Sequence, residues 1–416
     1  MRKIILSDRR KIFPFNEPAR DLRVLNKPLW LYQRDVLAPY VTEEREANSL
    51  AEIDAQQVET LVYRDNLFFD KFFVDEFILR AKESRKACRV SFRLDDRAIT
   101  AHAIHLQQGI RRKGDLYVAD MWYFPRGVEP LVHPLIIDTD AHEMGYYHVP
   151  THMSDDRDQL VYQVPTRAFC SIEHWVHTIT ANVIFGVYAQ AARRDRELER
   201  DVKKQLKTLW QAMLERKQVL SSSELVHIGR NCSIDPTAVI KGPTYIGDKV
   251  SIGPGAVIDV SIIGDHVNIM TGSQVMLSVV SDRCFLPFRA ALFMSVMMEN
   301  SMLAQNACVQ FCSIGRETFV GAGTTFTDFN LVPKTIRASY EGKFENAGMS
   351  VLGGCVGHHC FIGSGMVVYP GRAIESDVVL LASHDRRVID RTVYYKDSDH
   401  FALGDGRDLH ERRYGP

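Results

Sequence analysis

The 416-residue sequence lacks an excess of charge of either sign. Lysine and arginine together number 51, and aspartate and glutamate number 52, which gives a formal net charge of −1 at pH 7. Proteins that bind nucleic acid or an anionic membrane through their overall charge are strongly basic, so the composition argues against both partners. Long hydrophobic runs are also missing, because none reaches the roughly 18 residues of a membrane-spanning helix.

Cysteine is sparse, and the eight cysteines include no C-x-x-C pair. The first 15 residues contain no hydrophobic stretch of the kind found in a secretory signal. We therefore expect a cytoplasmic protein whose cysteines are reduced, small, buried residues.

Glycine is absent from the first 108 residues, whereas residues 227–416 contain 21 of the 26 glycines. A chain that makes many tight turns needs glycine, which tolerates backbone conformations that other residues avoid. The change in glycine content therefore predicts a change of architecture between the two halves of the chain.

The second half contains a hydrophobic repeat with a period of six residues. A helix would repeat about every 3.6 residues and a strand every two. Period six is typical of a three-sided coil in which each side places one aliphatic residue inside and a small residue at the corner, so that stacked coils bury a continuous column. One five-residue step follows Ile258, and the pattern is looser through Leu286, Leu292 and Met298. The clearest positions are Ile228, Ile234, Ile240, Ile246, Ile252, Ile258, Ile263, Ile269, Val275, Ile314, Val320, Val356, Ile362, Val368, Ile374 and Leu380.

Two segments interrupt or precede the repeat. The pattern lapses at residues 332–351, where charged and aromatic residues predict a loop or β-arm that leaves the solenoid. Residues 175–218 contain no proline and one glycine, which predicts helix. Their apolar face would pack on a neighbouring domain or bind a coiled-coil partner; it comprises Leu198, Val202, Leu206, Leu209, Trp210, Met213 and Leu214.

The period-six pattern resembles the left-handed parallel β-helix of acyltransferases and of the C-terminal halves of sugar nucleotidyltransferases. Residues 320–325 (VGAGTT) resemble the IGAGT coil of the bifunctional uridyltransferase/acetyltransferase that acts on glucosamine-1-phosphate. Residues 352–357 (LGGCVG) resemble a passage of its archaeal sugar-1-phosphate relatives, and residues 26–29 (NKPL) resemble the start of a nucleotidyltransferase helix.

This resemblance implies a four-part organisation. We expect a degenerate nucleotidyltransferase-like α/β domain at residues 1–170 and a helical linker at 171–222. A left-handed β-helix with its inserted loop should follow at 223–395, and a tail at 396–416. The resemblance further implies a homotrimer and a small-molecule ligand, either a sugar phosphate or a nucleotide sugar.

For the nucleotidyltransferase half, the resemblance implies a glycine-rich phosphate-binding turn after the first strand. No glycine occurs there, so we expect no pyrophosphorylase activity. Asp65, in the segment VYRDN, occupies roughly the place of the family's metal-binding aspartate. It would hold Mg²⁺ only if this half is active, and the alternative is an ordinary turn residue.

For the acyltransferase half, the resemblance implies an acetyl-CoA or related acyl-CoA site. Gly321, Gly323 and Thr324, together with Lys334, Gly363 and Ser364, would line it. Gln305 occupies the place of the family's catalytic histidine and cannot act as a base, because an amide does not titrate near neutrality. The family's asparagine corresponds to Asp328 or Asn330.

His358 and His359 are candidates for a substitute base, since one of two adjacent residues in a coil tends to point outward. Surface or interface histidines, or metal ligands, are the alternatives.

Three functions of the whole protein are consistent with these observations: an acyl-CoA-dependent acyltransferase with altered catalytic residues, a protein that binds a nucleotide sugar or sugar phosphate without turning it over, and a structural trimer.

Overall fold

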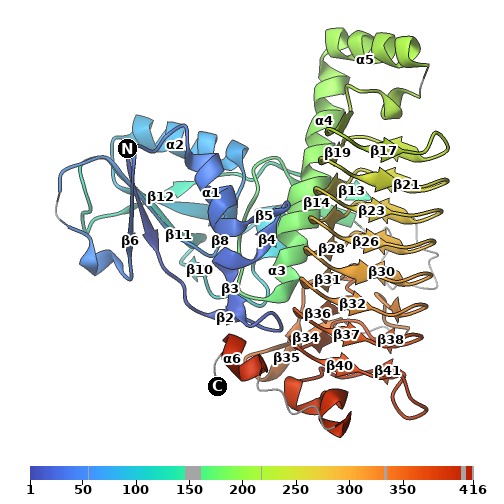
Figure 1. Cartoon of the computed structure of the whole chain (residues 1–416). Helices are drawn as coiled ribbons and strands as arrows, with labels where there is room; N and C mark the ends of the chain where they lie inside the picture. The colour runs from blue at the N-terminus through green and yellow to red at the C-terminus, as the bar shows by residue number, and fades with distance from the viewer. Residues whose placement is uncertain (55, 146–160, 217, 332–334, 404–408, 415–416) are drawn as a thin grey trace.

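The computed structural model describes residues 1–54, 56–145, 161–216, 218–331, 335–403 and 409–414. An α/β domain and a solenoid of parallel strands lie side by side, and a helical linker runs between them along the solenoid (Figure 1). The predicted fold class, an α/β domain followed by helices and a left-handed β-helix, is confirmed.

The α/β domain contains a seven-stranded mixed sheet in the order β12-β9-β11-β7-β1-β6, with β10 paired to β11. β1 is parallel to both β6 and β7, whereas β11 is antiparallel to β7 and β9. The strands are β1 (Arg2–Leu6), β6 (Glu43–Ala47), β7 (Thr60–Arg64), β9 (Cys88–Arg93), β10 (Ile110–Lys113), β11 (Leu116–Phe124) and β12 (His133–Ile136).

Two helices, α1 (Leu29–Leu37) and α2 (Lys71–Ser84), cover one face of this sheet. α2 begins at Asp70, whose side chain accepts a hydrogen bond from the Phe73 amide at 2.8 Å and so caps the helix. Phe73 and Phe77 are buried on its inner face. A separate small cluster around Val62 and Trp122 fills part of the opposite face of the sheet.

The linker consists of α3 (Trp175–Ile179), the wide helical segment η4 (Thr180–Tyr188), α4 (Ala189–Arg200) and α5 (Val202–Glu215). The residues of η4 are all buried between the sheet domain and the solenoid. α5 differs from the expectation that it packs on a neighbouring domain, because its apolar residues Val202, Leu206, Trp210 and Met213 are exposed. Within this chain its buried residues are Thr208 and Ala212.

The solenoid has three faces, each an eight-stranded parallel sheet. The first face comprises β16 (Val226–Ile228), β19 (Thr244–Ile246), β22 (Ile262–Ile263), β25 (Val279–Val280), β28 (Val296–Met297), β31 (Ser313–Ile314), β36 (Cys355–Val356) and β39 (Ala373–Ile374). The second comprises β17 (Ser233–Ile234), β20 (Ser251–Ile252), β23 (Asn268–Ile269), β26 (Phe285–Leu286), β29 (Met302–Leu303), β32 (Phe319–Val320), β37 (Phe361–Ile362) and β40 (Val379–Leu380). The third comprises β18 (Val239–Lys241), β21 (Val257–Asp259), β24 (Gln274–Met276), β27 (Ala291–Phe293), β30 (Cys308–Gln310), β33 (Thr325–Phe326), β38 (Val367–Val368) and β41 (Val388–Ile389).

The predicted aliphatic column is the core of the solenoid, with two corrections. Ile228 is 42% exposed, because it lies in the first coil and has no coil before it. Met297 rather than Met298 points into the solenoid core, because the third side is one residue shorter than the other two in the four successive coils between Ile246 and Ile314. Met298 instead packs in the cluster shared with the α/β domain.

The predicted arm is a hairpin of β34 (Arg337–Tyr340) and β35 (Lys343–Asn346), which leaves the solenoid after β33. Short paired strands elsewhere are β2 (Lys11–Ile12) with β3 (Glu17–Pro18), β4 (Arg23–Val24) with β5 (Lys27–Pro28), β8 (Leu67–Phe69) with β15 (Phe169–Ser171), and β13 (Ala141–Gly145) with β14 (Val161–Pro165). The chain ends with α6 (Leu409–Tyr414). Within the described ranges, no helix is long and apolar enough to cross a bilayer.

Candidate functional site

The carboxyl ends of β1 and β7 form the point at which the sheet order reverses. The chain passes from β1 to β6 on one side and then returns to β7 on the other side of β1. In open α/β sheets, ligands bind in the crevice outside such a reversal. Asp8 follows the end of β1 by two residues, and Asp65 and Asn66 directly follow β7.

A cavity of about 340 Å³ lies against Asp8 and Asn66. The α/β domain contributes one wall, the segment that leads into α3 a second, and the arm of the solenoid the third. This volume lies at the lower end of the range for small-molecule sites. The lining residues are Asp8, Arg10, Lys11, Ile12, Phe13, Ala19, Asn66, Ile172, Glu173, His174, Ser339, Tyr340 and Glu341.

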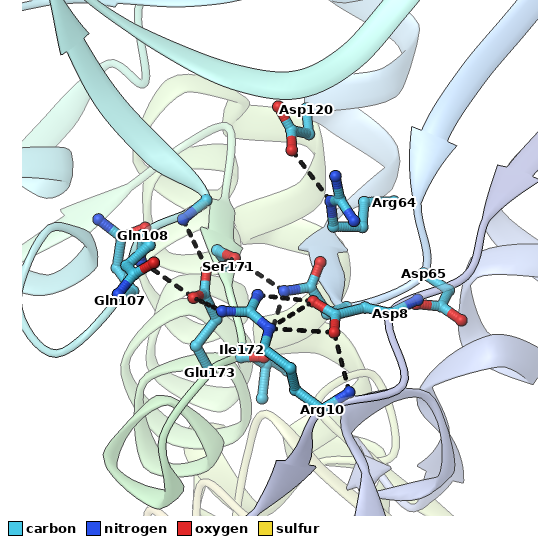
Figure 2. A network of polar contacts seen from close by, with 12 residues as sticks. Asp8, Arg10, Arg64, Asp65, Gln107, Gln108, Asp120, Ser171, Ile172 and Glu173 are labelled. Carbon is cyan, nitrogen blue, oxygen red and sulfur yellow. Dashed lines mark hydrogen bonds and ion pairs between the residues drawn. The ribbon is translucent and has the colours of Figure 1, made fainter. Parts of the chain in front are cut away.

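Arg10 links two carboxylates in this cavity (Figure 2). Its guanidinium lies 2.6 Å from Asp8 and 2.8 Å from Glu173. Burial opposes ionisation of Asp8, but hydrogen bonds and the charge of Arg10 together hold the pKa of this carboxyl below its usual value. Glu173 also accepts hydrogen bonds from the backbone amides of Gln108 and Gly109 at 3.0 and 2.6 Å. Arg10 therefore offsets one of the two carboxylate charges, and the backbone amides stabilise the remaining one.

Asn66 contributes a polar atom that has no hydrogen-bond partner within the described part of the chain. Its side chain is buried, and Nδ2 donates to Ser171 Oγ at 3.1 Å and to the Ile172 carbonyl at 3.5 Å. The carbonyl of Ile172 can only accept, which fixes the orientation of the amide. Oδ1 is then a buried acceptor without a hydrogen-bond donor among the described residues. An acceptor in this state is costly unless a ligand or water supplies a donor.

Asp65, predicted as a conditional Mg²⁺ ligand, is buried beside this cavity rather than lining it. Its carboxylate accepts a hydrogen bond from the Asp8 amide at 2.8 Å and lies 3.3 Å from Arg20. Burial raises the pKa of Asp65 to about 6. Among the described residues no cluster of three or more histidine, cysteine, aspartate or glutamate side chains could hold a metal ion, and Mg²⁺ gains no support.

His174 and His177 lie in the wall next to Glu173. His174 Nε2 lies 3.0 Å from the Ser339 carbonyl of the arm, and His177 Nε2 lies 2.8 Å from the His105 carbonyl. Burial lowers the pKa of His174 to about 3, with the nearby His177 adding to the effect. His174 is therefore neutral at physiological pH and connects the linker to the arm.

The predicted acyl-CoA residues of the solenoid lie at one corner, between the second and third faces. The Gly323 amide donates to the Gln305 carbonyl at 3.0 Å, and Thr324 Oγ1 donates to the Gly363 carbonyl at 2.9 Å. A Cβ added to Gly321 would lie 2.6 Å from the backbone of the next coil, at Gly363 and Ser364, so only glycine fits there. We call residues 304–306, 321–323 and 363–365 the glycine corner.

Asp328 and Asn330 lie beyond β33, where the arm leaves the solenoid, and not at the glycine corner. The backbone carbonyl of Asp328 accepts from the Leu352 amide at 2.9 Å, and burial raises the pKa of its carboxyl group. Lys334 lies outside the described residues.

His358 and His359 lie at a different corner, between the first and second faces. His358 is fully buried: Nδ1 accepts from the Arg316 amide at 3.0 Å, and Nε2 lies 3.1 Å from Glu17. Its ring packs on Phe15, with the two centroids 5.0 Å apart. His359 lies 3.1 Å from Glu317. The structure therefore places His358 inside the contact between the α/β domain and the solenoid.

This second corner, which we call the docking corner, carries a ladder of side-chain acceptors. Asp248, Asp265 and Asp282 each accept a hydrogen bond from the backbone amide one coil earlier, at 2.8, 2.7 and 2.9 Å. The Nδ1 atom of His358 performs the same function three coils after Asp282. The position of His358 in the repeat thus explains its burial.

Sequence comparison identifies the repeat. Residues 226–259 match the family model of the bacterial transferase hexapeptide (six repeats). These residues form the first coils of the solenoid, from β16 to β21. A comparison with curated proteins finds no match.

Solved structures similar to this chain include two acetyltransferases. A putative acetyltransferase from Bacillus cereus is 15% identical, with a TM-score of 0.16; the match covers 43% of this chain and 90% of that one. A mutant of GDP-perosamine N-acetyl transferase from Caulobacter crescentus, in complex with CoA and GDP-perosamine, is 17% identical, with a TM-score of 0.13. That match covers 38% of this chain and 54% of the other. Likenesses of this strength assign no activity to the chain.

Proposed function

We propose that the protein binds a sugar phosphate or nucleotide sugar, with the sugar ring in the cavity between Asp8, Asn66 and the arm. The unpartnered Oδ1 of the buried Asn66 is the observation that carries this proposal. Protein atoms cover Oδ1, so a sugar hydroxyl would reach it once the Asn66 amide turns toward the cavity, and would then supply the missing donor.

The rest of the lining also suits a sugar. Asp8, Glu173 and Arg10 together carry a net charge of only −1, so the cavity offers fixed hydrogen-bonding groups rather than a large excess of charge. Phe13 and Tyr340 supply aromatic surface, against which the apolar face of a sugar ring can pack. The arm contributes Tyr340, so the solenoid would take part in binding at a site that lies mainly on the α/β domain.

The arm provides a matched pair of variants to test this proposal. Tyr340→Ala removes an aromatic wall of the cavity, and we expect it to weaken the binding of a hexose-1-phosphate about tenfold, or about 1.4 kcal/mol. Phe344→Ala, on the other strand of the arm and exposed to solvent, should change the affinity less than about twofold, within the usual scatter for surface changes. Isothermal titration calorimetry measures both. Equal losses in the two variants, or no binding by the wild-type protein, would contradict the proposal.

A second candidate function is acyl transfer to the bound sugar from acyl-CoA. The hexapeptide match and the stacked backbone of the glycine corner favour it. Gln305, Asn306 and Ser364 at this corner have no group that titrates near neutrality. His358 is already engaged by Arg316 and Glu17, and both histidines lie at the other corner of the second face, so a group from a neighbouring subunit, a histidine of its docking corner included, would have to act as the base.

A homotrimer is part of this second candidate, and an apolar stripe on the second face of the solenoid supports it. Outward-facing Phe285, Met302, Phe319, Phe361 and Val379 are paired in register from coil to coil. β32 and β37 carry this stripe and lead directly into the glycine corner. A neighbouring subunit packed on the stripe would therefore form a cleft beside Gly321 and Gly363.

Phe361→Lys tests the trimer and the acyl-CoA site together. Phe361 is 55% exposed in the single chain, so the substitution should leave the fold of each subunit intact. We expect the mass from light scattering to fall from that of three chains to that of one, because a charge would be buried in the interface. Acetyl-CoA binding should be lost with it. A monomeric wild-type protein would contradict the trimer, and a monomeric variant that still binds acetyl-CoA would place that site within one chain.

A further inference from the structure

Three arginines converge on one carboxylate at the open face of the α/β sheet. Asp120 lies 2.9 Å from Arg64, 2.6 Å from Arg89 and 3.1 Å from Arg111. Asp120 is buried, whereas Arg111 is 60% exposed. Three guanidinium groups around a single carboxylate leave an excess of positive charge on this face.

The strand register explains why these side chains meet. Trp122 of β11 pairs with Val62 of β7, and both belong to the cluster on the face that α1 and α2 do not cover. Side chains two residues apart lie on the same face, which places Asp120 and Arg64 together beyond that cluster. Arg111 of β10 pairs with Val118 of β11 and joins the same face. The cluster is therefore built by four strands of a rigid sheet.

The arginines retain donors for an additional acceptor. Arg64 uses only Nε, and Arg111 only one Nη, in hydrogen bonds within the described part of the chain. The pKa of Arg89 is lowered, chiefly by burial, and the charges of Arg111 and Arg64 add to this effect. An anion that accepts from Arg64 and Arg111 would offset this repulsion and form charge-assisted hydrogen bonds.

The cluster is next to the cavity. Figure 2 shows Arg64 between Asp120 and the Asp8–Arg10 pair, and the charge of Arg64 is one of the causes that lower the pKa of Asp8. Asp65 and Asn66 follow Arg64 directly at the end of β7. One ligand could therefore contact Asn66 with its sugar and Arg64 with a group attached to that sugar.

We propose that Arg64, Arg89 and Arg111 bind the phosphoryl or diphosphoryl group of the ligand whose sugar ring occupies the cavity. This inference rests on the function proposed above and assigns the charged part of the ligand. Arginine suits the role because its planar group donates two parallel hydrogen bonds to phosphate oxygens. The sugar and the phosphate would thus be recognised by separate groups, the sugar by a cavity without positive excess and the phosphate by a cluster that carries one.

Two substitutions on the same strand test the phosphate site. Arg111→Gln removes one positive charge from the cluster. Arg112→Gln is the control, because it removes the same charge from the next residue. The Arg112 side chain points to the other side of the strand and donates to the Gly114 carbonyl. We expect Arg111→Gln to weaken the binding of inorganic pyrophosphate and of a hexose-1-phosphate about tenfold. Arg112→Gln should change either affinity less than about threefold, the effect of a screened charge. Calorimetry at two salt concentrations measures the affinities.

The outcomes separate this inference from the proposed function. Equal losses in Arg111→Gln and Arg112→Gln would show attraction by general charge and overturn the phosphate site. If Arg111→Gln leaves hexose-1-phosphate binding unchanged and Tyr340→Ala weakens it, the phosphate site would be wrong and the sugar cavity would be supported. Pyrophosphate binding that depends on Arg111, together with unchanged hexose-1-phosphate binding in Tyr340→Ala, would support the phosphate site and contradict the sugar cavity.

Discussion

Replacing His358 by alanine is expected to lower the free energy of unfolding by about 3 kcal/mol, because two hydrogen bonds of a fully buried side chain are lost at once. The Arg316 amide would lose its acceptor, and the partly buried Glu17 would lose a donor. The ring also fills space against Phe15, and its removal leaves a cavity. Urea unfolding at pH 7.5 measures the change.

Two further substitutions separate the causes of this loss. His358→Asn retains an acceptor oxygen for the Arg316 amide, as aspartate provides in the earlier coils, and should recover about half of the lost stability. His359→Ala breaks only a partly exposed contact with Glu317 and should cost less than about 1 kcal/mol. If His359→Ala were as damaging as His358→Ala, or if His358→Ala were neutral, the docking role of His358 would be wrong.

The lowered pKa of His358 predicts how the stability of the folded protein changes with pH. Burial lowers its pKa below the ordinary value of 6.5, so the unfolded chain takes up the proton first as the pH falls. A protonated ring also cannot accept the Arg316 hydrogen bond at Nδ1. The wild-type protein should therefore lose stability below about pH 6.5, and His358→Asn should lack this contribution.

The solenoid was predictable because its signal is local and repeated. Ile252, Ile258 and Ile269 occupy the predicted interior, and the arm interrupts the repeat within the predicted segment. The pattern does not reveal that the five-residue step recurs in successive coils. Met297 and Met298 are both apolar, so the sequence does not show which of them faces the solenoid core. Similarly, the spacing of His358 gives no sign that Phe15 and Glu17, more than 300 residues earlier, cover it.

The cavity was less predictable, because its walls come from three distant parts of the chain. The resemblance singles out Asp65 as a conditional metal ligand, but the sequence does not show that its side chain is buried beside the cavity. Glu173 lies 163 residues from Arg10 and carries no motif, so only the fold brings them together. The Asp8-x-Arg10 spacing directly after the first strand was a usable signal, since short polar segments at strand ends often face ligands.

Asp65→Asn is expected to stabilise the protein at pH 7.5 by about 2 kcal/mol, because burial makes the ionised carboxylate costly. Its pKa is raised from 3.8 to about 6, and each unit corresponds to about 1.4 kcal/mol, which makes about 3 kcal/mol the upper bound of the gain. The asparagine oxygen can still accept from the Asp8 amide. A buried carboxylate that lowers the stability of the fold beside a cavity is typical of functional sites, where residues needed for activity often reduce the free energy of unfolding.

The protonation of Asp65 in the folded and unfolded chains determines how the stability difference between wild type and Asp65→Asn changes with pH. Below about pH 4 both the folded and unfolded chains hold the proton, so wild type and Asp65→Asn should be equally stable. Between about pH 4 and pH 6 the unfolded chain ionises while the folded chain does not, so wild-type stability falls relative to the variant as the pH rises. Asp54→Asn is the matched control with the opposite sign, because a hydrogen bond from Arg2 lowers the pKa of Asp54. Urea unfolding at pH 4, 5, 6 and 7.5 measures these differences. If Asp65→Asn is less stable than wild type at pH 7.5, the prediction is wrong and ionised Asp65 stabilises the fold through Arg20.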